Sequence, residues 1–290
     1  MSNMINPFTD WGFKRIFGSE ESKPVMIELL NAAIDDDHPI VDIIYRDKEQ
    51  TPEEPDNRTV IYDIYCTTSD GRHIIVEMQY GRQSTFKERT LYYAARAINK
   101  QGASMGENYK IDEVVVVSIL KKPNLKVSDK VRTVVMLTDI DSHKVFTDRL
   151  RLIYLQVSLA ESMKREECVT DLDRLIFNLN NMEKLDELAF KDKNPVFVDM
   201  ERLAQTIGLS DDEWAAYDRA IKRMKDYDAV MEGERAFARE EGLAEGRAEG
   251  RAEGMQQEKL AIATNLKKLG TPIDIIVQAS GLTKEQVDAL

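Results

Sequence analysis

Residues 59–80, TVIYDIYCTTSDGRHIIVEMQY, contain two segments in which apolar and polar residues alternate. A period of two predicts β-strands, and the Ser-Asp-Gly sequence at residues 69–71 predicts the turn of a hairpin. A three-residue turn centred on Asp70 pairs residues whose numbers add to 140. This register puts Asp63 directly opposite Glu77, on one face of the hairpin. Gln79 lies two residues after Glu77 and shares that face.

The rest of the chain up to residue 158 predicts three helices and four further strands. Helices are expected at residues 13–17, 20–34 and 84–103, and strands at residues 40–46, 113–120, 131–138 and 149–157. Ser84 is the expected N-cap of the third helix, and the alternation in the last two strands predicts half-exposure. A loop is expected at residues 47–58. The order α-α-β-β-β-α-β-β-β predicts an α/β fold, with a mixed α+β sheet flanked by helices.

From residue 158 the chain has the period of helices. Helices are expected near residues 171–189, 198–207 and 211–229, as a lid or a bundle. Residues 241–255 then repeat a four-residue unit that places Gly242, Gly246, Gly250 and Gly254 four apart. On a helix these glycines form a slowly winding groove that another helix can approach closely. The alternative is a flexible tether with partial helicity.

The last segment, LGTPIDIIVQASGLTKEQVDAL, predicts two short helices separated at Ser280 and Gly281. A capping box formed by Thr283 and Gln286 is expected to start the second helix. The outline resembles a helix-turn-helix, but Glu285 and Asp288 against a single lysine do not suit the DNA major groove. We therefore favour a helical hairpin used in assembly, and expect a homo-oligomer formed through the C-terminal helices.

Composition limits the expected cellular location and excludes some kinds of site. The longest apolar run, VVVVSIL, is far shorter than a membrane span, and the N-terminus does not resemble a signal peptide, so the expected location is the cytoplasm. Two cysteines, Cys66 and Cys168, are too few for a disulfide scaffold, and Cys66 is expected to be a buried free thiol. The three histidines match no zinc-site spacing.

The two acids of the hairpin are the candidate chemical groups. Directly opposed side chains lie about 4.5–5.5 Å apart at Cβ, where like charges destabilise the sheet unless a positive charge lies between them. Mg²⁺ and Mn²⁺ prefer oxygen ligands, so Asp63, Glu77 and the backbone at Met78 form a candidate metal site. A metal there would suit phosphodiester hydrolysis. The alternative is a pair of solvent-facing acids, although the apolar residues of both strands indicate a central hairpin.

Gln79 can hold a water or a phosphate oxygen, but it supplies neither positive charge nor a base. A nearby cation must supply that charge. The segment after the hairpin, between residues 81 and 101, is locally basic: Glu88 is its single acid, and its basic residues are Arg82, Lys87, Arg89, Arg96 and Lys100. They form either a phosphate-tracking surface or a solvated helix face. The net charge of −12 by itself argues mildly against nucleic acid as a partner.

Four segments together resemble a known family. They are NPFTDWGFKRIFGSEESKPVMIELLNAAI near the N-terminus, the IVEMQY strand, the FKERTLYYAARAINKQ helix and the glycine repeat. From about residue 6 to 154 the chain is similar to the recombination-promoting nuclease, or putative transposase, family of bacteria, in the PD-(D/E)XK nuclease superfamily. The resemblance implies a restriction-endonuclease-like αβββαβ core with a C-terminal helical extension. It also implies a DNA endonuclease that uses Mg²⁺ or Mn²⁺ and is associated with recombination, mobile elements or defence.

The resemblance also implies residue roles. Asp63 and Glu77 match the metal ligands, and Gln79 occupies the position of the superfamily's lysine. Lys14, Lys87 or Lys100 then becomes the candidate source of the missing charge. Asp10 and Lys14, four apart in the N-terminal motif, are candidate catalytic residues, with an ordinary salt bridge as the alternative. The candidate DNA-binding residues are Arg82, Lys87, Arg89 and Lys100, with Arg89 as the candidate phosphate contact.

We expect three regions: a nuclease-like domain at residues 1–158, a helical subdomain at 159–232, and a third region at 233–290 with the glycine repeat and the helical hairpin. One alternative to an active enzyme is a catalytically decayed nuclease fold that acts as an assembly or DNA-binding module. Another is a nuclease whose activity the C-terminal helices restrain. A fold alone does not choose among these alternatives.

Overall fold

The computed structural model describes residues 3–50, 60–102, 109–122 and 128–290. The chain forms two compact units, Met1–Lys225 and Asp226–Leu290. The three-region division expected from the sequence stays a prediction. No helix among the described residues is both long enough and apolar enough to cross a membrane.

A six-stranded mixed sheet is the centre of the first unit, as predicted. In spatial order its strands are β1 (Ile43–Tyr45), β4 (Ile64–Thr68), β5 (His73–Gln79), β6 (Val114–Leu120), β8 (Leu150–Gln156) and β7 (Arg132–Met136). Strands β5, β6 and β8 are parallel to one another, and the other pairings in this sheet are antiparallel. A separate two-stranded ladder pairs β2 (Glu49–Gln50) with β3 (Val60–Ile61). Strand β2 lies within the segment expected as a loop, residues 47–58, so that expectation was wrong at residues 49–50; residues 51–58 of the segment lie outside the described residues.

The register of the hairpin agrees with the sequence prediction. Ile64 pairs with Val76 and Tyr65 pairs with Ile75, so paired numbers add to 140. Strand β4 begins at Ile64, which places Asp63 one residue before the strand and opposite Glu77. The hairpin is central, because β1 and β6 pair with its two outer sides. Cys66, in β4, is a fully buried free thiol, as expected.

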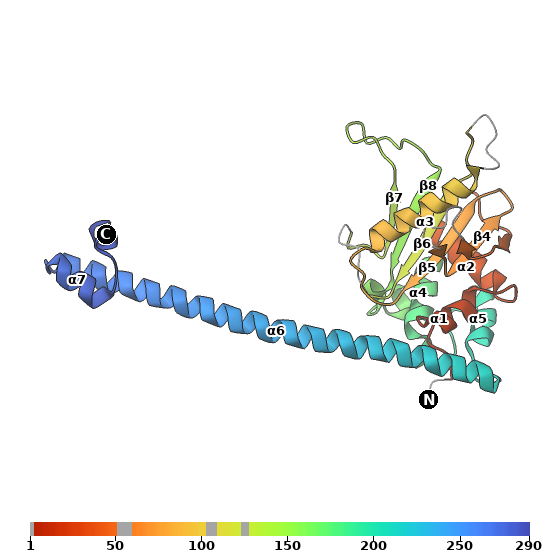
Figure 1. Ribbon diagram of the computed structural model, residues 1–290. Coiled ribbons are helices and arrows are strands. Elements are labelled where there is room, and N and C mark those ends of the chain that lie inside the picture. Colours follow the sequence, from red (N-terminus) through yellow and green to blue (C-terminus); the bar gives the residue numbers. More distant parts are fainter. Residues whose placement is uncertain (1–2, 51–59, 103–108, 123–127) are drawn as a thin grey trace. The chain divides into compact units, whose positions relative to one another are not determined.

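Helices cover both faces of the sheet. Helix α3 (Phe86–Lys100) crosses one face (Figure 1), where its apolar side packs on residues such as Ile75, Val116 and Tyr154. A larger core on the other face includes residues from α1 (Asp10–Phe17), α2 (Lys23–Ile34), α4 (Asp171–Asn181) and α5 (Val196–Ala204). Three short 3-10 segments, Val157–Ala160, Arg165–Glu167 and Met182–Lys184, lie beside α4 in the sequence.

Three further local expectations were wrong. The third helix begins at Phe86 rather than residue 84, with Thr85 as an N-cap whose side chain makes no capping hydrogen bond. Strand β8 is mostly buried rather than half-exposed, because it lies between β6 and β7 with a helical layer on each face. The helix expected at residues 211–229 is the start of α6 (Asp211–Lys268), which continues through the glycine repeat.

The N-terminal motif is a tight turn onto α1. Thr9 caps the helix by accepting a hydrogen bond from the Gly12 backbone at 3.0 Å, and the Thr9 hydroxyl donates to the Asn6 carbonyl at 3.0 Å. A Cβ on Gly12 would lie 2.2 Å from that same Asn6 carbonyl oxygen, so only glycine fits. The motif residues therefore fix how α1 approaches the rest of the fold.

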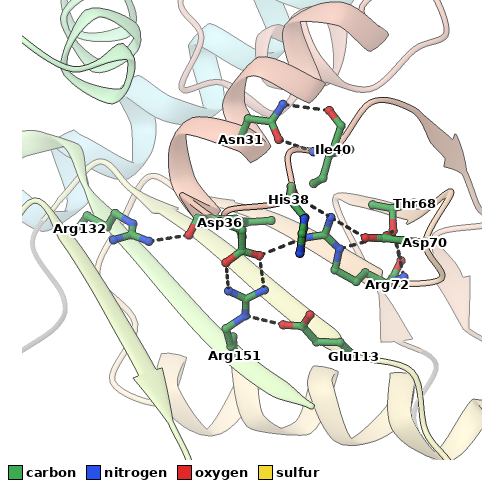
Figure 2. Close-up of polar contacts among 11 residues, drawn as sticks. Asn31, Asp36, His38, Ile40, Thr68, Asp70, Arg72, Glu113, Arg132 and Arg151 are labelled. Atoms are coloured by element: carbon green, nitrogen blue, oxygen red, sulfur yellow. Dashed lines mark hydrogen bonds and ion pairs between the residues drawn. The ribbon is translucent and has the colours of Figure 1, made fainter. Parts of the chain in front are cut away.

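A charged network joins α2 to the sheet at the end where β5 and β6 begin (Figure 2). Arg151 donates two hydrogen bonds to Asp36, at 2.7 and 2.8 Å, and a third to Glu113. Arg72 contacts Asp36 at 3.1 Å and Asp70 at 2.8 Å, and Arg132 donates to the last carbonyls of α2. This network holds the start of the parallel strands, at the opposite end of β5 from Glu77 and Gln79.

The second unit contains the helical hairpin predicted from the sequence. Helices α7 (Ile273–Ser280) and α8 (Lys284–Asp288) pack with the end of α6 around Ala263, Ile276, Leu282 and Val287. Gly281 has φ 68°, which ends α7, and Thr283 forms the expected capping box with Gln286. Along the repeat, a Cβ at any of the four glycines would meet no described atom within 4 Å.

Candidate metal and DNA site

Asp63 and Glu77 are held together at the open end of the central hairpin. The Asp63 backbone N–H donates to Glu77 Oε1 at 3.1 Å, and the Met78 backbone N–H donates to Asp63 Oδ2 at 2.8 Å. The Asp63 carboxylate thus accepts the hydrogen bond from a backbone N–H of β5, as a backbone carbonyl of a paired strand would, at the point where β4 begins. The pairing predicted from the sequence is present in the fold.

Both acids sit in an environment that disfavours their charged forms. Glu77 is 4% exposed and Asp63 is half-buried. Burial, followed by the nearby Asp63 charge, raises the pKa of Glu77. Burial also raises the pKa of Asp63, although the Met78 hydrogen bond, Lys14 and Arg89 oppose this shift. Two carboxylates placed in this way need positive charge between them or a retained proton.

Gln79 lies on the same face of β5 and is 8% exposed. Its amide nitrogen donates to the Gly81 carbonyl at 2.9 Å, and its amide oxygen accepts from Arg89 Nη2 at 2.7 Å. The same Arg89 nitrogen lies 3.9 Å from Glu77 Oε2. The structure therefore brings Arg89, expected only as a phosphate contact, into direct contact with Gln79, the residue that the resemblance matched to the superfamily's lysine.

Helix α1 brings Asp10 and Lys14 to the neighbourhood of the acids. The two side chains form an i, i+4 salt bridge, which was the alternative interpretation of the motif. The Lys14 charge lowers the pKa of both Asp63 and Glu77, and the Asp10 charge raises the pKa of Asp63. A salt bridge and a place beside the site are thus both present.

The other basic candidates lie in the segment after β5 and along α3. Arg82 is exposed in the segment after β5, and Lys87 is exposed in the first turn of α3. Lys100 is the last residue of α3, eleven residues or about 16 Å along the helix from Arg89. It adjoins Gln101, which bonds to Asp112 near the start of β6. The structure therefore does not bring Lys100 to the acid pair.

Sequence reasoning missed Ser118. It is the polar residue within the apolar VVVVSIL run of β6, and it is in register with Glu77. Its hydroxyl is fully buried and has no hydrogen-bond partner among the described residues. The sequence feature that could have identified Ser118 is a single serine in a buried strand beside an acid, because a buried hydroxyl normally has a hydrogen-bond partner.

The family can be decided by comparison with known proteins. A family model described as PD-(D/E)XK nuclease family transposase matches residues 7–234. The chain belongs to this family. The match continues past residue 154, where the resemblance in the sequence was expected to end, through α4 and α5 into α6. No curated protein and no solved structure gave a match.

Nucleases of the PD-(D/E)XK family generally use divalent metals, and the donor set of this member fits a hard cation. In the part of the chain that the structure describes, no three His, Cys, Asp or Glu side chains gather to hold a metal ion. Two carboxylates are nevertheless enough for Mg²⁺, which commonly keeps several waters and takes further ligands from substrate phosphates. The Met78 backbone N–H bonds to the Asp63 carboxylate, so the Met78 peptide group lies beside the acid pair.

Proposed function

We propose that the protein is a divalent-metal-dependent DNA endonuclease that hydrolyses phosphodiester bonds, with Mg²⁺ or Mn²⁺ as cofactor. The observation that carries the proposal is the pairing of half-buried Asp63 with buried Glu77 at the end of a central hairpin. Two carboxylates with raised pKa values are costly to keep charged without a cation. Family membership supports nucleic acid as the substrate.

In this proposal Asp63, Glu77 and the Met78 carbonyl hold the metal. When bound, the metal would activate a water and stabilise charge on the phosphate. The backbone N–H groups of Asp63 and Met78 hold the two carboxylates in place, each from the opposite strand. Arg89 and Lys14 add positive charge beside the acids, which suits a polyanionic substrate. Arg82, three residues after Gln79, and Lys87, in the first turn of α3, are exposed and are further candidates for phosphate contacts.

The setting of this activity is part of the proposal. We infer a role in recombination, mobile-element movement or defence, in the cytoplasm. We also infer a homo-oligomer formed through the C-terminal helices, since the four glycines of the repeat leave one helix surface open to close approach.

A plasmid-nicking assay tests the activity. Supercoiled DNA is incubated with Mg²⁺ or Mn²⁺ and with the wild type, Asp63→Ala, Glu77→Ala or Asp129→Ala. Asp129 is an exposed acid before β7 and serves as the matched control. The wild type and Asp129→Ala should nick the plasmid, whereas the other two variants should not. Equal nicking by all four proteins would contradict the proposal.

A second candidate function is a decayed nuclease fold that binds DNA or assembles without cutting. The observation in its favour is Gln79, which carries no charge at the position of the superfamily's lysine. Calorimetric titration with Mn²⁺ separates the two candidates, because a decayed site should release no heat of metal binding. Heat that is present in the wild type and lost in Asp63→Ala supports the active enzyme.

A further inference from the structure

The Gln79 side chain has a single orientation in the site. Its amide nitrogen faces an acceptor, the Gly81 carbonyl, and its amide oxygen faces a donor, Arg89 Nη2. Turning the amide over would set donor against donor and acceptor against acceptor, so the two contacts together fix it. Gln79 therefore presents an oxygen, in a nearly closed environment, to the guanidinium of Arg89.

The Arg89 guanidinium is held on several sides. Nη2 bonds to Gln79, and Nη1 donates to Gln83 Oε1 at 2.7 Å. The group lies 5.2 Å from the ring centre of Phe86 and 5.8 Å from that of Tyr93. Side-chain rotation is therefore restricted, while 28% of the side chain remains exposed.

Arg89 keeps hydrogen-bonding capacity for a substrate. A guanidinium has five N–H donors in a fixed fork, and the contacts to Gln79 and Gln83 use two of them. Its Nε has no partner among the described residues but is buried, so the second N–H groups of Nη1 and Nη2 are the donors left for a substrate. A planar, permanently charged fork suits the oxygens of a phosphate.

The competing cations are less well placed. Lys14 is paired with Asp10, and Lys100 lies about 16 Å along α3 from Arg89. Lys87 is exposed in the first turn of α3. Arg89 contacts Gln79, lies 3.9 Å from Glu77 and lowers the pKa of both acids.

We propose that Arg89 supplies the positive charge at the scissile phosphate, in place of the superfamily's lysine, and that Gln79 is the positioning residue that holds it there. The inference rests on the proposed nuclease function. In the sequence the charge lies ten residues after Gln79, on the next helix. In the fold, the hydrogen bond from Arg89 Nη2 to Gln79 places that charge at the end of β5. Preorganised charge of this kind commonly contributes about 10²–10³-fold to kcat.

The first test moves the positive charge from residue 89 to residue 79. Arg89→Gln should lower kcat about 100-fold. The double variant Gln79→Lys with Arg89→Gln should recover at least about tenfold of that loss, because the new lysine starts from the superfamily's position. Gln79→Ala should lower kcat about tenfold and leave KM nearly unchanged. A merely structural Arg89 would not be rescued by a lysine at residue 79.

The second test needs no cleavage. Binding of a labelled DNA duplex is measured in EDTA as a function of salt concentration. Arg89→Gln should reduce the slope of log Kd against log salt by about 0.9, the value for one lost phosphate contact, and Arg89→Lys should restore it. Arg149→Gln is the matched control, since Arg149 precedes β8 at the other end of the parallel strands. This control should keep the wild-type slope.

The outcomes separate the inference from the proposed function. If the wild type does not cleave with Mg²⁺ or Mn²⁺, the nuclease proposal fails, while the salt slope still tests the phosphate contact of Arg89. If the wild type cleaves and Arg89→Gln cleaves equally well, only the present inference is overturned. The same holds if the double variant is no faster than Arg89→Gln. Should Arg89→Gln fail to fold, Gln79→Ala decides, because unchanged kcat in that variant overturns the positioning role.

Discussion

The Asp63 backbone N–H bonds to the Glu77 carboxylate, and the Asp63 carboxylate bonds to the backbone N–H of the residue after Glu77. Each strand of the hairpin thus holds the acid of the other. Glu77 is buried and Asp63 is half-buried, and burial together with mutual repulsion makes the metal-free site electrostatically unfavourable. Five predictions about stability, metal binding and assembly concern this site, the fold around it and the C-terminal helices.

Glu77→Gln should stabilise the metal-free protein at pH 8 and change little at pH 5. Burial and Asp63 raise the pKa of Glu77 to about 8, so the folded state retains a proton that the unfolded state releases above about 4.5. Stability therefore falls as pH rises through that window. Glutamine keeps the shape without the charge. Thermal unfolding in EDTA at both pH values measures the effect, and an equal loss of stability at both would contradict it.

Mn²⁺ should raise the melting temperature of the wild type more at pH 8 than at pH 6. Protons and metal compete for the same carboxylates, so metal affinity increases as the acids lose their protons. At a metal concentration 100 times Kd, the gain is about 2.7 kcal/mol. Asp63→Asn should remove the shift, and Asp129→Asn should keep it. A shift that survives in Asp63→Asn would place the metal elsewhere.

Asp36→Asn should destabilise the first unit, and the difference from wild type should shrink at acid pH. Hydrogen bonds from Arg151 lower the pKa of Asp36, so its contribution is present above the ordinary carboxyl range and lost as pH falls through the lowered value. For a unit of this size each kcal/mol corresponds to about 2–4 °C. Denaturation of both proteins at pH 7 and pH 3 tests this, and a difference independent of pH would refute the role assigned to the Asp36 charge.

Gly12→Ala should destabilise the protein by at least about 1–3 kcal/mol, because its Cβ would overlap the Asn6 carbonyl oxygen at 2.2 Å. Gly233→Ala is the matched control. Gly233 lies in α6 with no described atom within 4 Å of its Cβ position, and alanine there should stabilise by up to about 1 kcal/mol. Urea unfolding of both variants measures the contrast, and equal signs would count against this account.

Gly246→Leu together with Gly250→Leu should reduce the solution mass of the full-length protein to that of a monomer. Leucine side chains would fill the surface that the glycine repeat leaves open for close approach. Light scattering after size-exclusion chromatography gives the mass. A monomeric wild type, or variants of unchanged mass, would argue against assembly through this helix.

Much of the fold followed from local patterns. The alternation in the hairpin, the apolar run of β6 and the capping box at Thr283 predicted elements that the structure contains. Such features depend on residues near one another in sequence, where period and turn chemistry act directly. The burial of β8 and the length of α6 were missed, because the first depends on both neighbouring strands and the second on a glycine-rich segment with weak helix propensity.

The candidate site divides in the same way. By itself the sequence determined that Asp63 faces Glu77 with Gln79 beside it, since a short turn and a period of two fix which residues share a face. Only the tertiary structure decided which basic side chain lies beside these residues. Five basic residues follow the hairpin, and a helical pattern does not state how α3 is rotated and placed on the sheet. Packing of α3 against β5 and β6 selects Arg89, and the turn at Asn6 and Gly12 sets the approach of α1 that brings Lys14 near.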